Sequence, residues 1–494
     1  MKSIKIYFLI MLVALTSCSE DVMDGINKNP NDPNDVPSRF ILTDVMTSSA
    51  FSITGADYNF YASVYMELNV GTWGQMYNAE IRTGEPIASS TYNNSWNAQY
   101  RNLRQLQIVI DKCSPGGSEE GNWTNLGIAR ILAAYNWAML TDLMGDIPFN
   151  EAMKPGIVFQ PKIDKQEDVY KHVMTLLDSA VVNMGKAQIA TRPFLGTQDF
   201  IYGGIIRTEN AANITTWRNT WIKAAQGLKA RYLMRLSHKS PKYQEVVAAV
   251  DASFANATEE LKFVYNGTTS VNPMHRFFTD RNNLSASASL KAKLDARTDP
   301  RAARFFRAPT GQTSILFAPN GNPIQQQNVY GISNITSVTA PTYLLSYHEL
   351  QFVKAEALVR LGGAANLALA ETALNNAVQA AFVKVGLTAA AGATYFTTTV
   401  KPLFDANPLS EVLMQKYLSQ YECEAVESFN DYRRYRAMGN AAFIPLANAR
   451  NATQFPLRFT YGSSDVTANL NVKDAYGDGS YVYTERVWWA GGTR

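Results

Sequence analysis

The strongest constraint on the fold is a series of long segments in which apolar residues recur every three to four positions. In the first of these, Leu126, Ala129 and Trp137 share one face, the pattern of a helix with a buried stripe. Between residues 255 and 340, and again after 440, this period is lost and Gly, Asn, Pro and Thr dominate. We therefore expect a mainly α fold with long irregular loop insertions and little β-structure. The predicted helices cover residues 123–143, 166–184, 216–237, 343–361, 366–382 and 409–438.

Two of these segments form a predicted antiparallel pair. The helix over 343–361 ends at Gly362 and Gly363, and the helix over 366–382 follows at once. Helix pairs of this size resemble stacked helical-repeat units, although the chain has no clean self-similarity at a 34-residue period. We expect one helical body rather than a string of separate domains.

The N-terminus has the features of an export signal. Lys2 and Lys5 precede the apolar run 6–15, which is too short to remain as a membrane-spanning helix. The run ends in Leu15-Thr16-Ser17-Cys18, which fits the lipobox of a bacterial lipoprotein. We predict removal of residues 1–17 and lipid attachment at Cys18, so that acyl chains hold the protein on a membrane. An ordinary secretory signal that happens to end at Cys18 is the alternative.

The segment after the predicted cleavage site is rich in Asn, Asp and Pro. These residues favour turns and extended backbone, so residues 18–38 form a predicted lipidated tether and residues 39–494 the folded body. No later apolar run approaches 18 residues.

Composition excludes some classes of function and leaves others open. The 494 residues carry a net charge of only +3, with no basic run and no zinc-finger spacing, so a nucleic-acid partner is not expected. Besides Cys18 there are two cysteines, Cys113 and Cys423. An exported protein meets oxidising conditions, so these two either form one disulfide or remain two buried thiols.

Catalytic and metal-binding motifs are absent from the sequence. Four histidines are present, without H-E-x-x-H, G-x-S-x-G, Walker or C-x-x-C patterns, and His348 is predicted to be a structural histidine on an amphipathic helix. A pair of carboxylates for glycoside hydrolysis is a spatial arrangement that sequence cannot test. Asp474, Asp478 and Glu485 match a calcium loop only in part, because Tyr476 stands at a ligand position. We expect no catalytic residue, cofactor or metal.

Aromatic residues in loops are the best candidates for a binding site. Aromatic rings stack on the apolar faces of sugars or on peptide side chains, and nearby amides and guanidinium groups bond hydroxyls or carbonyls. The alternative is that each ring pins its own loop to the core. Trp96 has helical spacing with Tyr100 and is assigned to the core. The predicted ligand-binding residues are Trp73, Gln75, Tyr77, Asn78 and Arg82, with Phe277 and Arg281 as a second cluster next to His275.

Short motifs are spread along nearly the whole chain. They are the lipobox at Cys18, Asn29-Pro30-Asn31, Trp96 with Tyr100, residues 130–135 running into Gly145-Asp146-Ile147-Pro148-Phe149, residues 217–231, residues 347–357, residues 424–434 ending in Tyr432-Arg433-Arg434, and Val487-Trp488-Trp489. No single motif is specific, but their order and spacing are. Together they resemble the SusD/RagB family of outer-membrane nutrient-binding lipoproteins.

This resemblance implies a body of four tetratricopeptide-like helix pairs whose loops form a shallow ligand face. It also implies a partner, a SusC-like TonB-dependent outer-membrane barrel over which the protein sits as a hinged lid. Glu349, Glu356 and Arg433 would be buried ionic and capping groups rather than catalysts. The acidic residues after Cys18 resemble the signal that sends such lipoproteins to the outer face of the outer membrane. One departure is that residues 455–461 lack the acid of the Arg-x-x-Tyr-Pro-x-x-Glu motif that many relatives carry.

The leading hypothesis is a cell-surface lipoprotein that binds oligosaccharides, performs no chemistry on them and delivers them to the barrel. The first alternative keeps this role with peptides as ligands. A second is a lipid-anchored glycoside hydrolase. A third is a helical adaptor, in which Trp73 and Tyr77 would be buried.

Overall fold

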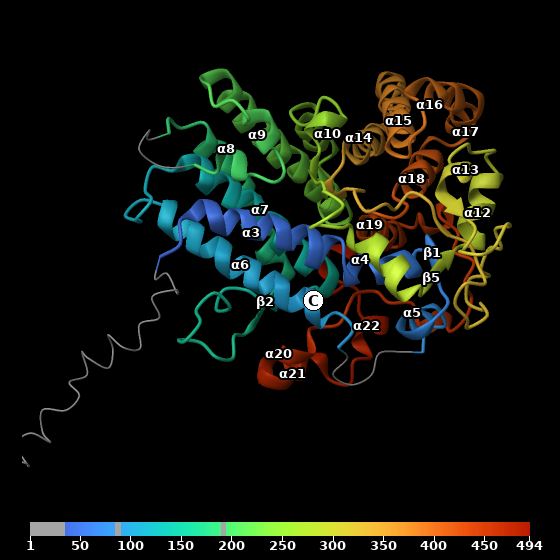
Figure 1. Cartoon of the computed structure of the whole chain (residues 1–494), viewed down its shortest axis with the longest axis horizontal. Helices are drawn as coiled ribbons and strands as arrows, with labels where there is room; N and C mark the ends of the chain where they lie inside the picture. Colours follow the sequence, from blue (N-terminus) through green and yellow to red (C-terminus); the bar gives the residue numbers. More distant parts are fainter. Residues whose placement is uncertain (1–34, 84–89, 189–193) are drawn as a thin grey trace, which may run out of the picture.

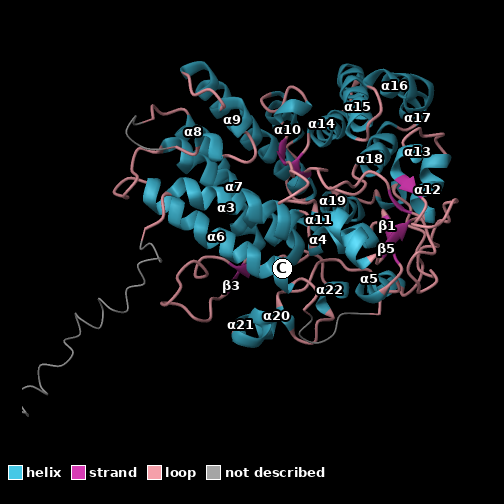
Figure 2. Cartoon of the chain, viewed as in Figure 1, coloured by secondary structure: helices cyan, strands magenta, loops and turns pink. Residues whose placement is uncertain are grey.

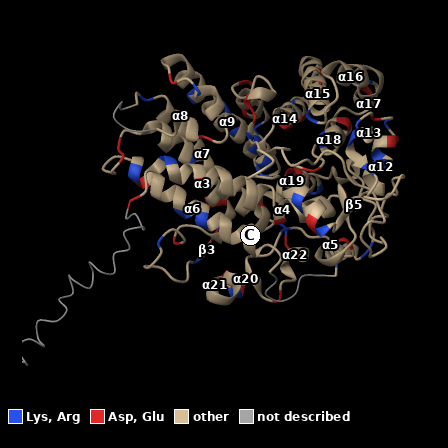
Figure 3. Ribbon diagram, in the orientation of Figure 1, with Lys and Arg blue, Asp and Glu red and all other residues tan. Residues whose placement is uncertain are grey.

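The computed structural model of the protein describes residues 35–83, 90–188 and 194–494. The predicted signal peptide, Cys18 and most of the predicted tether lie outside these residues. Figures 1 and 2 show a mainly helical body in which strands are few and short, as the sequence predicts. Basic and acidic residues are interspersed over the ribbon, without a block of one sign (Figure 3).

One half of the body is a layer of helices that come from the N-terminal half of the chain and pack together. The central helix, α7, is buried on nearly all sides because it is apolar all round. The predicted helices over 123–143 and 166–184 match two members of this layer to within one residue. The layer comprises α3 (Ser38–Ser48), α6 (Asn93–Cys113), α7 (Trp123–Met144), α8 (Gln166–Met184) and α9 (Ala211–Arg235).

The predicted start of α9 at Thr216 is too late. The helix begins five residues earlier because the side chain of Asn210 accepts a hydrogen bond from the backbone N–H of Asn213 and caps it. A polar cap that lies before the apolar stripe begins is not visible in the periodicity.

The other half of the body is a second group of helices, drawn in green and orange in Figure 1. Its central pair, α14 and α15, reverses direction at Gly362 and Gly363, both of which have positive φ, 72° and 83°. This confirms the predicted pair. The group comprises α10 (Tyr243–Asp251), α14 (Tyr347–Leu361), α15 (Ala364–Lys384), α16 (Ala389–Tyr395), α17 (Lys401–Ala406), α18 (Pro408–Ser419) and α19 (Ala425–Ala437).

Two predicted helices of this group have wrong boundaries. The segment 409–438 is two helices, because Glu422 adopts a left-handed φ of 73° and the Asn59 side chain binds both the Glu422 carbonyl and the Ala425 N–H. The segment from Tyr343 begins as a strand, and the helix starts only after Ser346, whose hydroxyl caps it.

The remaining segments are irregular, with short elements, as predicted. In the described part of the chain, four antiparallel strand pairs connect them: β1 (Asn69–Gly71) with β5 (Leu284–Ala286), β2 (Ile147–Pro148) with β3 (Ile163–Asp164), β4 (Leu261–Phe263) with β8 (Thr342–Leu345), and β6 (Phe306–Arg307) with β7 (Ile332–Ser333). The short helices are α4 (Asp57–Tyr65), α5 (Gly74–Glu80), α11 (Pro273–Arg276), α12 (Ala288–Asp295), α13 (Ala302–Phe305), α20 (Ser463–Ala468), α21 (Leu470–Tyr476) and α22 (Tyr481–Thr484), with π-helices η1 (Ser49–Thr54), η6 (Phe277–Arg281) and η7 (Phe396–Val400).

Buried ion pairs hold α9 of the first half to α14 of the second, and α19 to α14 within the second half. Arg231 on α9 binds both carboxylate oxygens of Glu349 on α14, and Arg434 on α19 binds both oxygens of Glu356, at 2.7 Å each. Burial alone would raise the pKa of Glu356, but Arg434 and Arg360 lower it to about 2. Such pairs hold their helices in one register because separating them would leave a buried charge without a partner.

Arg433 instead donates to the carbonyl oxygens of Asp142, at 2.6 Å, and Leu457, at 3.1 Å, and so caps the end of α7. The assignment of Glu349, Glu356 and Arg433 to the scaffold is therefore confirmed.

Candidate functional site

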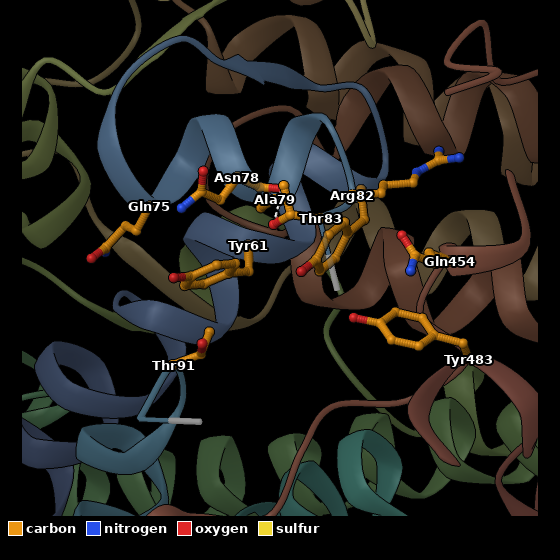
Figure 4. A pocket seen from close by; sticks show the side chains of 10 residues that line it. Tyr61, Gln75, Asn78, Ala79, Arg82, Thr83, Thr91, Gln454 and Tyr483 are labelled. Carbon is orange, nitrogen blue, oxygen red and sulfur yellow. Dashed lines mark hydrogen bonds between the residues drawn. The ribbon is translucent and has the colours of Figure 1, made fainter. Parts of the chain in front are cut away.

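A cavity of about 460 Å³ opens where α4, α5 and the C-terminal segments meet. Figure 4 shows Tyr61 below the helix that carries Gln75 and Asn78, with Gln454 and Tyr483 facing it from the C-terminal part of the chain. We call it the tyrosine cavity. Its lining residues are Tyr61, Tyr65, Gln75, Asn78, Ala79, Arg82, Thr83, Thr91, Gln454 and Tyr483.

The aromatic wall of the tyrosine cavity belongs to α4. Tyr61 and Tyr65 are four residues apart, so they lie on the same face of this helix. The ring of Tyr61 meets the edge of Tyr92 at 5.1 Å, and Tyr92 stacks in parallel on Phe459 at 4.2 Å. Because this stack continues into the core, the tyrosine side chains are held rigidly rather than free to rotate.

The polar wall belongs to α5, which the β1–β5 ladder holds in place. The backbone N–H of Thr72 donates to the Asn283 carbonyl at 2.9 Å, and the hydroxyls of Thr72 and Ser285 are also 2.9 Å apart. The turn into α5 is so tight that a side chain at Gly71 would start 1.8 Å from the Met76 carbonyl oxygen. Only glycine fits there.

Glu80, the last residue of α5, is fully buried beneath the cavity. Its carboxylate accepts hydrogen bonds from the N–H groups of Gly71 and Gly321 and, at 3.3 Å, from the Asn448 side chain. Burial raises the pKa of Glu80 to about 8, with the nearby Glu67 adding to the rise. The hydrogen bonds to its backbone partners lower the pKa but do not cancel the effect of burial.

Arg82 lines the cavity mainly with its stem. The side chain is 6% exposed, its Nη1 donates to the Arg450 carbonyl at 3.2 Å, and the guanidinium lies 5.3 Å from the centre of the Phe455 ring. Figure 4 shows the guanidinium directed away from Tyr61. The polar groups left facing the space are the hydroxyls of tyrosine and threonine and the amides of asparagine and glutamine. The tyrosine cavity therefore presents an essentially uncharged surface of flat rings and hydrogen-bonding groups.

The structure thus brings Gln75, Asn78 and Arg82 of the predicted set together in one cavity. Trp73 and Tyr77 lie beside it without lining it: Trp73 precedes α5 and is 42% exposed, and Tyr77 is half-buried on α5. The predicted loop thus contains a short helix. The exposure of Trp73 also contradicts the adaptor alternative, in which this side chain would be buried.

The sequence reasoning missed Tyr61, Tyr65 and Tyr483. The first two lie on a short helix full of aromatic residues, where a core assignment is the natural one. Tyr483 is more than 400 residues away from them in the chain. The only available signal was the high tyrosine content.

Phe277 and Arg281 line a different cavity, of about 530 Å³, on another face of α4. We call it the phenylalanine cavity. Its lining residues are Phe51, Ser52, Ala56, Phe60, Thr269, Val271, Pro273, Arg276, Phe277, Asp280 and Arg281.

The other groups considered at the sequence level have structural roles. His348 is buried, with Nε2 2.9 Å from the Glu424 carboxylate and 3.3 Å from the Ser346 hydroxyl. This confirms His348 as a structural histidine. Glu485 of the partial calcium motif pairs with Arg494, and no cluster of three or more His, Cys, Asp or Glu side chains suited to a metal occurs within the described residues.

The two remaining cysteines do not form a disulfide. Cys113 is buried in α6 and Cys423 is half-buried after α18, and they stand as two separate thiols. Of the helices in the described part of the chain, none combines the length and the apolar character needed to cross a membrane.

Comparison with known proteins identifies the fold and the family. The model of a SusD-like family described as "Starch-binding associating with outer membrane" matches residues 30–462. The chain belongs to the SusD/RagB family. A SusD/RagB family protein from Bacteroides thetaiotaomicron is 41% identical, with a TM-score of 0.84 over 93% of this chain and 100% of that one.

More distant SusD-like structures share the fold. A SusD homologue from Bacteroides fragilis is 19% identical, with a TM-score of 0.71 over 92% of this chain and 100% of its own. A chitin-binding SusD homologue from Flavobacterium johnsoniae is also 19% identical, with a TM-score of 0.71 over 91% of this chain and 98% of its own. None of the curated proteins matches the sequence.

Membership in the SusD/RagB family decides the class of function. SusD-like proteins are nutrient-binding proteins associated with the outer membrane and do no catalysis, so this chain is a binding protein rather than an enzyme. The hydrolase alternative is therefore wrong.

Proposed function

We propose that this SusD-like protein captures an oligosaccharide in the tyrosine cavity at the cell surface and passes it to a SusC-like TonB-dependent barrel. The observation that carries the proposal is the lining of the cavity, in which fixed tyrosine rings face uncharged amides and hydroxyls. A sugar ring offers an apolar face and a rim of hydroxyls, and this surface complements both.

The predicted residues take distinct roles in this proposal. Asn78 and Gln75 bond sugar hydroxyls at the edge of α5, and the stem of Arg82 closes the cavity behind them. Trp73 is exposed next to this edge and stacks on sugar units that extend beyond the cavity. Tyr77 supports the same edge from its half-buried position on α5.

The membrane anchor completes the role. Lipid on Cys18 would hold the mature protein on the outer face of the outer membrane, and the Asn- and Pro-rich tether would let the body move as a lid above the barrel. The lipobox and membership in the family support both steps. The anchor is tested by cell fractionation, in which the Cys18→Ala variant is expected to be absent from the outer-membrane fraction. The partner is tested by purification of the wild-type lipoprotein, which is expected to copurify with a TonB-dependent barrel.

Ligand binding is tested by isothermal titration of the detergent-solubilised lipoprotein against a glycan panel. The panel begins with malto-oligosaccharides and chito-oligosaccharides, because the family description names starch and one relative binds chitin. Asn78→Ala is expected to weaken the best glycan roughly tenfold, because a polar group buried against the ligand loses its partner. Gln312→Ala, at an exposed amide outside both cavities, is the matched control. Equal affinities for the two variants would place the glycan elsewhere.

A further inference from the structure

The phenylalanine cavity is built on two π-helical segments. Phe51 and Ser52 belong to η1 and Phe277, Asp280 and Arg281 belong to η6. π-Helices make up well under 1% of residues in globular proteins and occur frequently at functional sites, because the extra residue redirects side chains. Two such segments in one cavity wall indicate a site rather than a packing defect.

The floor of this cavity is aromatic and rigid. Phe60 on α4 stacks on Phe277 with ring centres 4.2 Å apart. Phe51 is held from the side by Phe263, at 5.6 Å, and Tyr265, at 4.8 Å, both edge-on. The rings therefore offer a fixed apolar surface for a side chain of similar size.

Among the residues that the structure describes, the rim of this cavity carries one cation without a partner. Arg276 and Asp280 pair with each other at 3.6 Å, so their charges are matched. The carbonyl of Arg281 accepts a hydrogen bond from Gln327 Nε2 at 2.6 Å, which fixes its backbone. Within the described part of the chain, the Arg281 guanidinium itself makes no ion pair or hydrogen bond. An exposed guanidinium beside an aromatic floor is suited to a carboxylate attached to an apolar group.

The polar groups argue against a neutral sugar as the occupant. Among the described residues, the polar side chains that line this cavity besides the three charged ones are Ser52 and Thr269, and the Thr269 hydroxyl already accepts a hydrogen bond from Asn266 at 2.7 Å. A sugar ring carries several hydroxyls that would lose water without gaining partners. A peptide end with an apolar side chain needs few such partners besides the carboxylate.

We propose that the phenylalanine cavity binds the C-terminal end of a short peptide, with its last, apolar side chain on the Phe60–Phe277 stack and its carboxylate at Arg281. This second site goes beyond the proposed glycan function and does not depend on it. The helix α4 contributes Phe60 to this cavity and Tyr61 to the tyrosine cavity. The same helix would therefore form part of the binding sites for two classes of nutrient.

The experiment is a titration of the detergent-solubilised full-length lipoprotein, read by saturation-transfer NMR and calorimetry. The probes are the dipeptide Gly-Phe, the same dipeptide with an amidated C-terminus, and sodium glucuronate as a carboxylate on a sugar ring. Gly-Phe is expected to bind, the amide roughly three to ten times more weakly, and glucuronate more weakly than the amide, because an exposed guanidinium–carboxylate contact gives modest affinity.

Two variants locate the site. Arg281→Gln is expected to give the dipeptide acid and its amide equal affinities, whereas the matched control Arg207→Gln, at an exposed arginine outside both cavities, keeps the difference. Ala56→Phe fills the cavity with a ring and is expected to abolish dipeptide binding, with the melting temperature measured to show that the body remains folded.

Three results would overturn the proposal: equal binding of acid and amide to the wild type, an unchanged preference in Arg281→Gln, or glucuronate bound as tightly as Gly-Phe. The best glycan is titrated into the same Arg281→Gln sample. Its affinity reports on the tyrosine cavity alone, so failure of the peptide site and failure of the glycan site are distinguished.

Discussion

The two cavities on α4 are close in size and different in chemistry. The tyrosine cavity, about 460 Å³, is lined by hydroxyls and amides around tyrosine rings, whereas the phenylalanine cavity, about 530 Å³, has phenylalanine rings and charged side chains. Phe60 and Tyr61 are neighbours in the chain but line different cavities. Volume alone therefore says little about the ligand, and the polar groups around the rings decide its class.

The cavities also differ in how their walls are supported. The wall of the tyrosine cavity formed by α5 is anchored by the fully buried carboxyl of Glu80, whereas the phenylalanine cavity is framed by exposed charges on α11 and η6. A buried acid makes its surroundings sensitive to pH, and exposed charges make theirs sensitive to salt. The two sites should therefore respond to different perturbations.

The largest expected effect concerns Glu80. Its pKa of about 8 in the folded protein exceeds the ordinary value of 4.5, so the stability it contributes is fully present below pH 4.5 and is lost as the pH rises through 8. In Glu80→Gln, we expect the decline in the free energy of unfolding between pH 5 and pH 9 to be smaller by about 2–5 kcal/mol. Urea unfolding at a series of pH values measures it.

Asp142 and Glu422 also have raised pKa values, of about 6 and about 7, and both remain in this variant. The difference between the two proteins therefore isolates Glu80. If the free energy of unfolding depends on pH in the same way in wild type and variant, Glu80 is ionised across the whole range. The two cavities then do not differ in their sensitivity to pH.

The next effect is on ligand affinity in the tyrosine cavity. Tyr483→Ala removes a ring that faces Tyr61 from α22 and leaves the phenylalanine cavity untouched. We expect glycan affinity to fall roughly 10- to 30-fold, since loss of a central aromatic contact costs about 2 kcal/mol. Binding of Gly-Phe should change less than twofold. Parallel loss of both ligands by calorimetry would mean that the cavities act as one site.

A higher salt concentration should weaken ligand binding in the phenylalanine cavity and leave binding in the tyrosine cavity nearly unchanged. Raising NaCl from 50 to 500 mM is expected to weaken Gly-Phe binding roughly three- to fivefold, because exposed charges are screened over a few ångströms at high ionic strength. Glycan binding in the uncharged tyrosine cavity should stay within twofold. A strong salt effect on the glycan would indicate that the Arg82 guanidinium turns into the cavity on binding.

The smallest effect is expected at Trp73. This side chain lies next to the tyrosine cavity without lining it, so Trp73→Ala should weaken long oligosaccharides about two- to threefold and leave short ones unchanged. Titration with a size series of the best glycan tests this. A loss of affinity that is equal at every length would place Trp73 inside the primary site.

Much of the scaffold was predictable because helical periodicity is a local property. The stripe in 166–184 gave the bounds of α8, and the two glycines after Leu361 gave the α14–α15 turn. The break between α18 and α19 was not predictable, because it depends on Asn59, more than 350 residues away in the chain. A tertiary contact of this kind overrides local helix propensity, and the apolar periodicity of the sequence does not reveal it.

The candidate site was predictable only in part, for the same reason. Gln75 and Asn78 stood out because glycines and amides surround them in sequence. Tyr61 looked like a core residue, and it is one on most of its surface, since it is only 6% exposed. Burial and ligand contact are compatible for a side chain at the bottom of a cavity, and sequence cannot separate them.

By itself, the sequence determined the helical class, the positions of most of the long helices, the scaffold roles of Glu349 and Glu356, and the family, because each depends on local periodicity or on motifs read in order. Only the tertiary structure decided that the aromatic residues divide into two cavities of different chemistry. The reason is that Tyr61 and Tyr483, like Phe60 and Phe277, meet only after chain segments hundreds of residues apart have packed together. A binding surface is made of such long-range neighbours, and no local pattern specifies them.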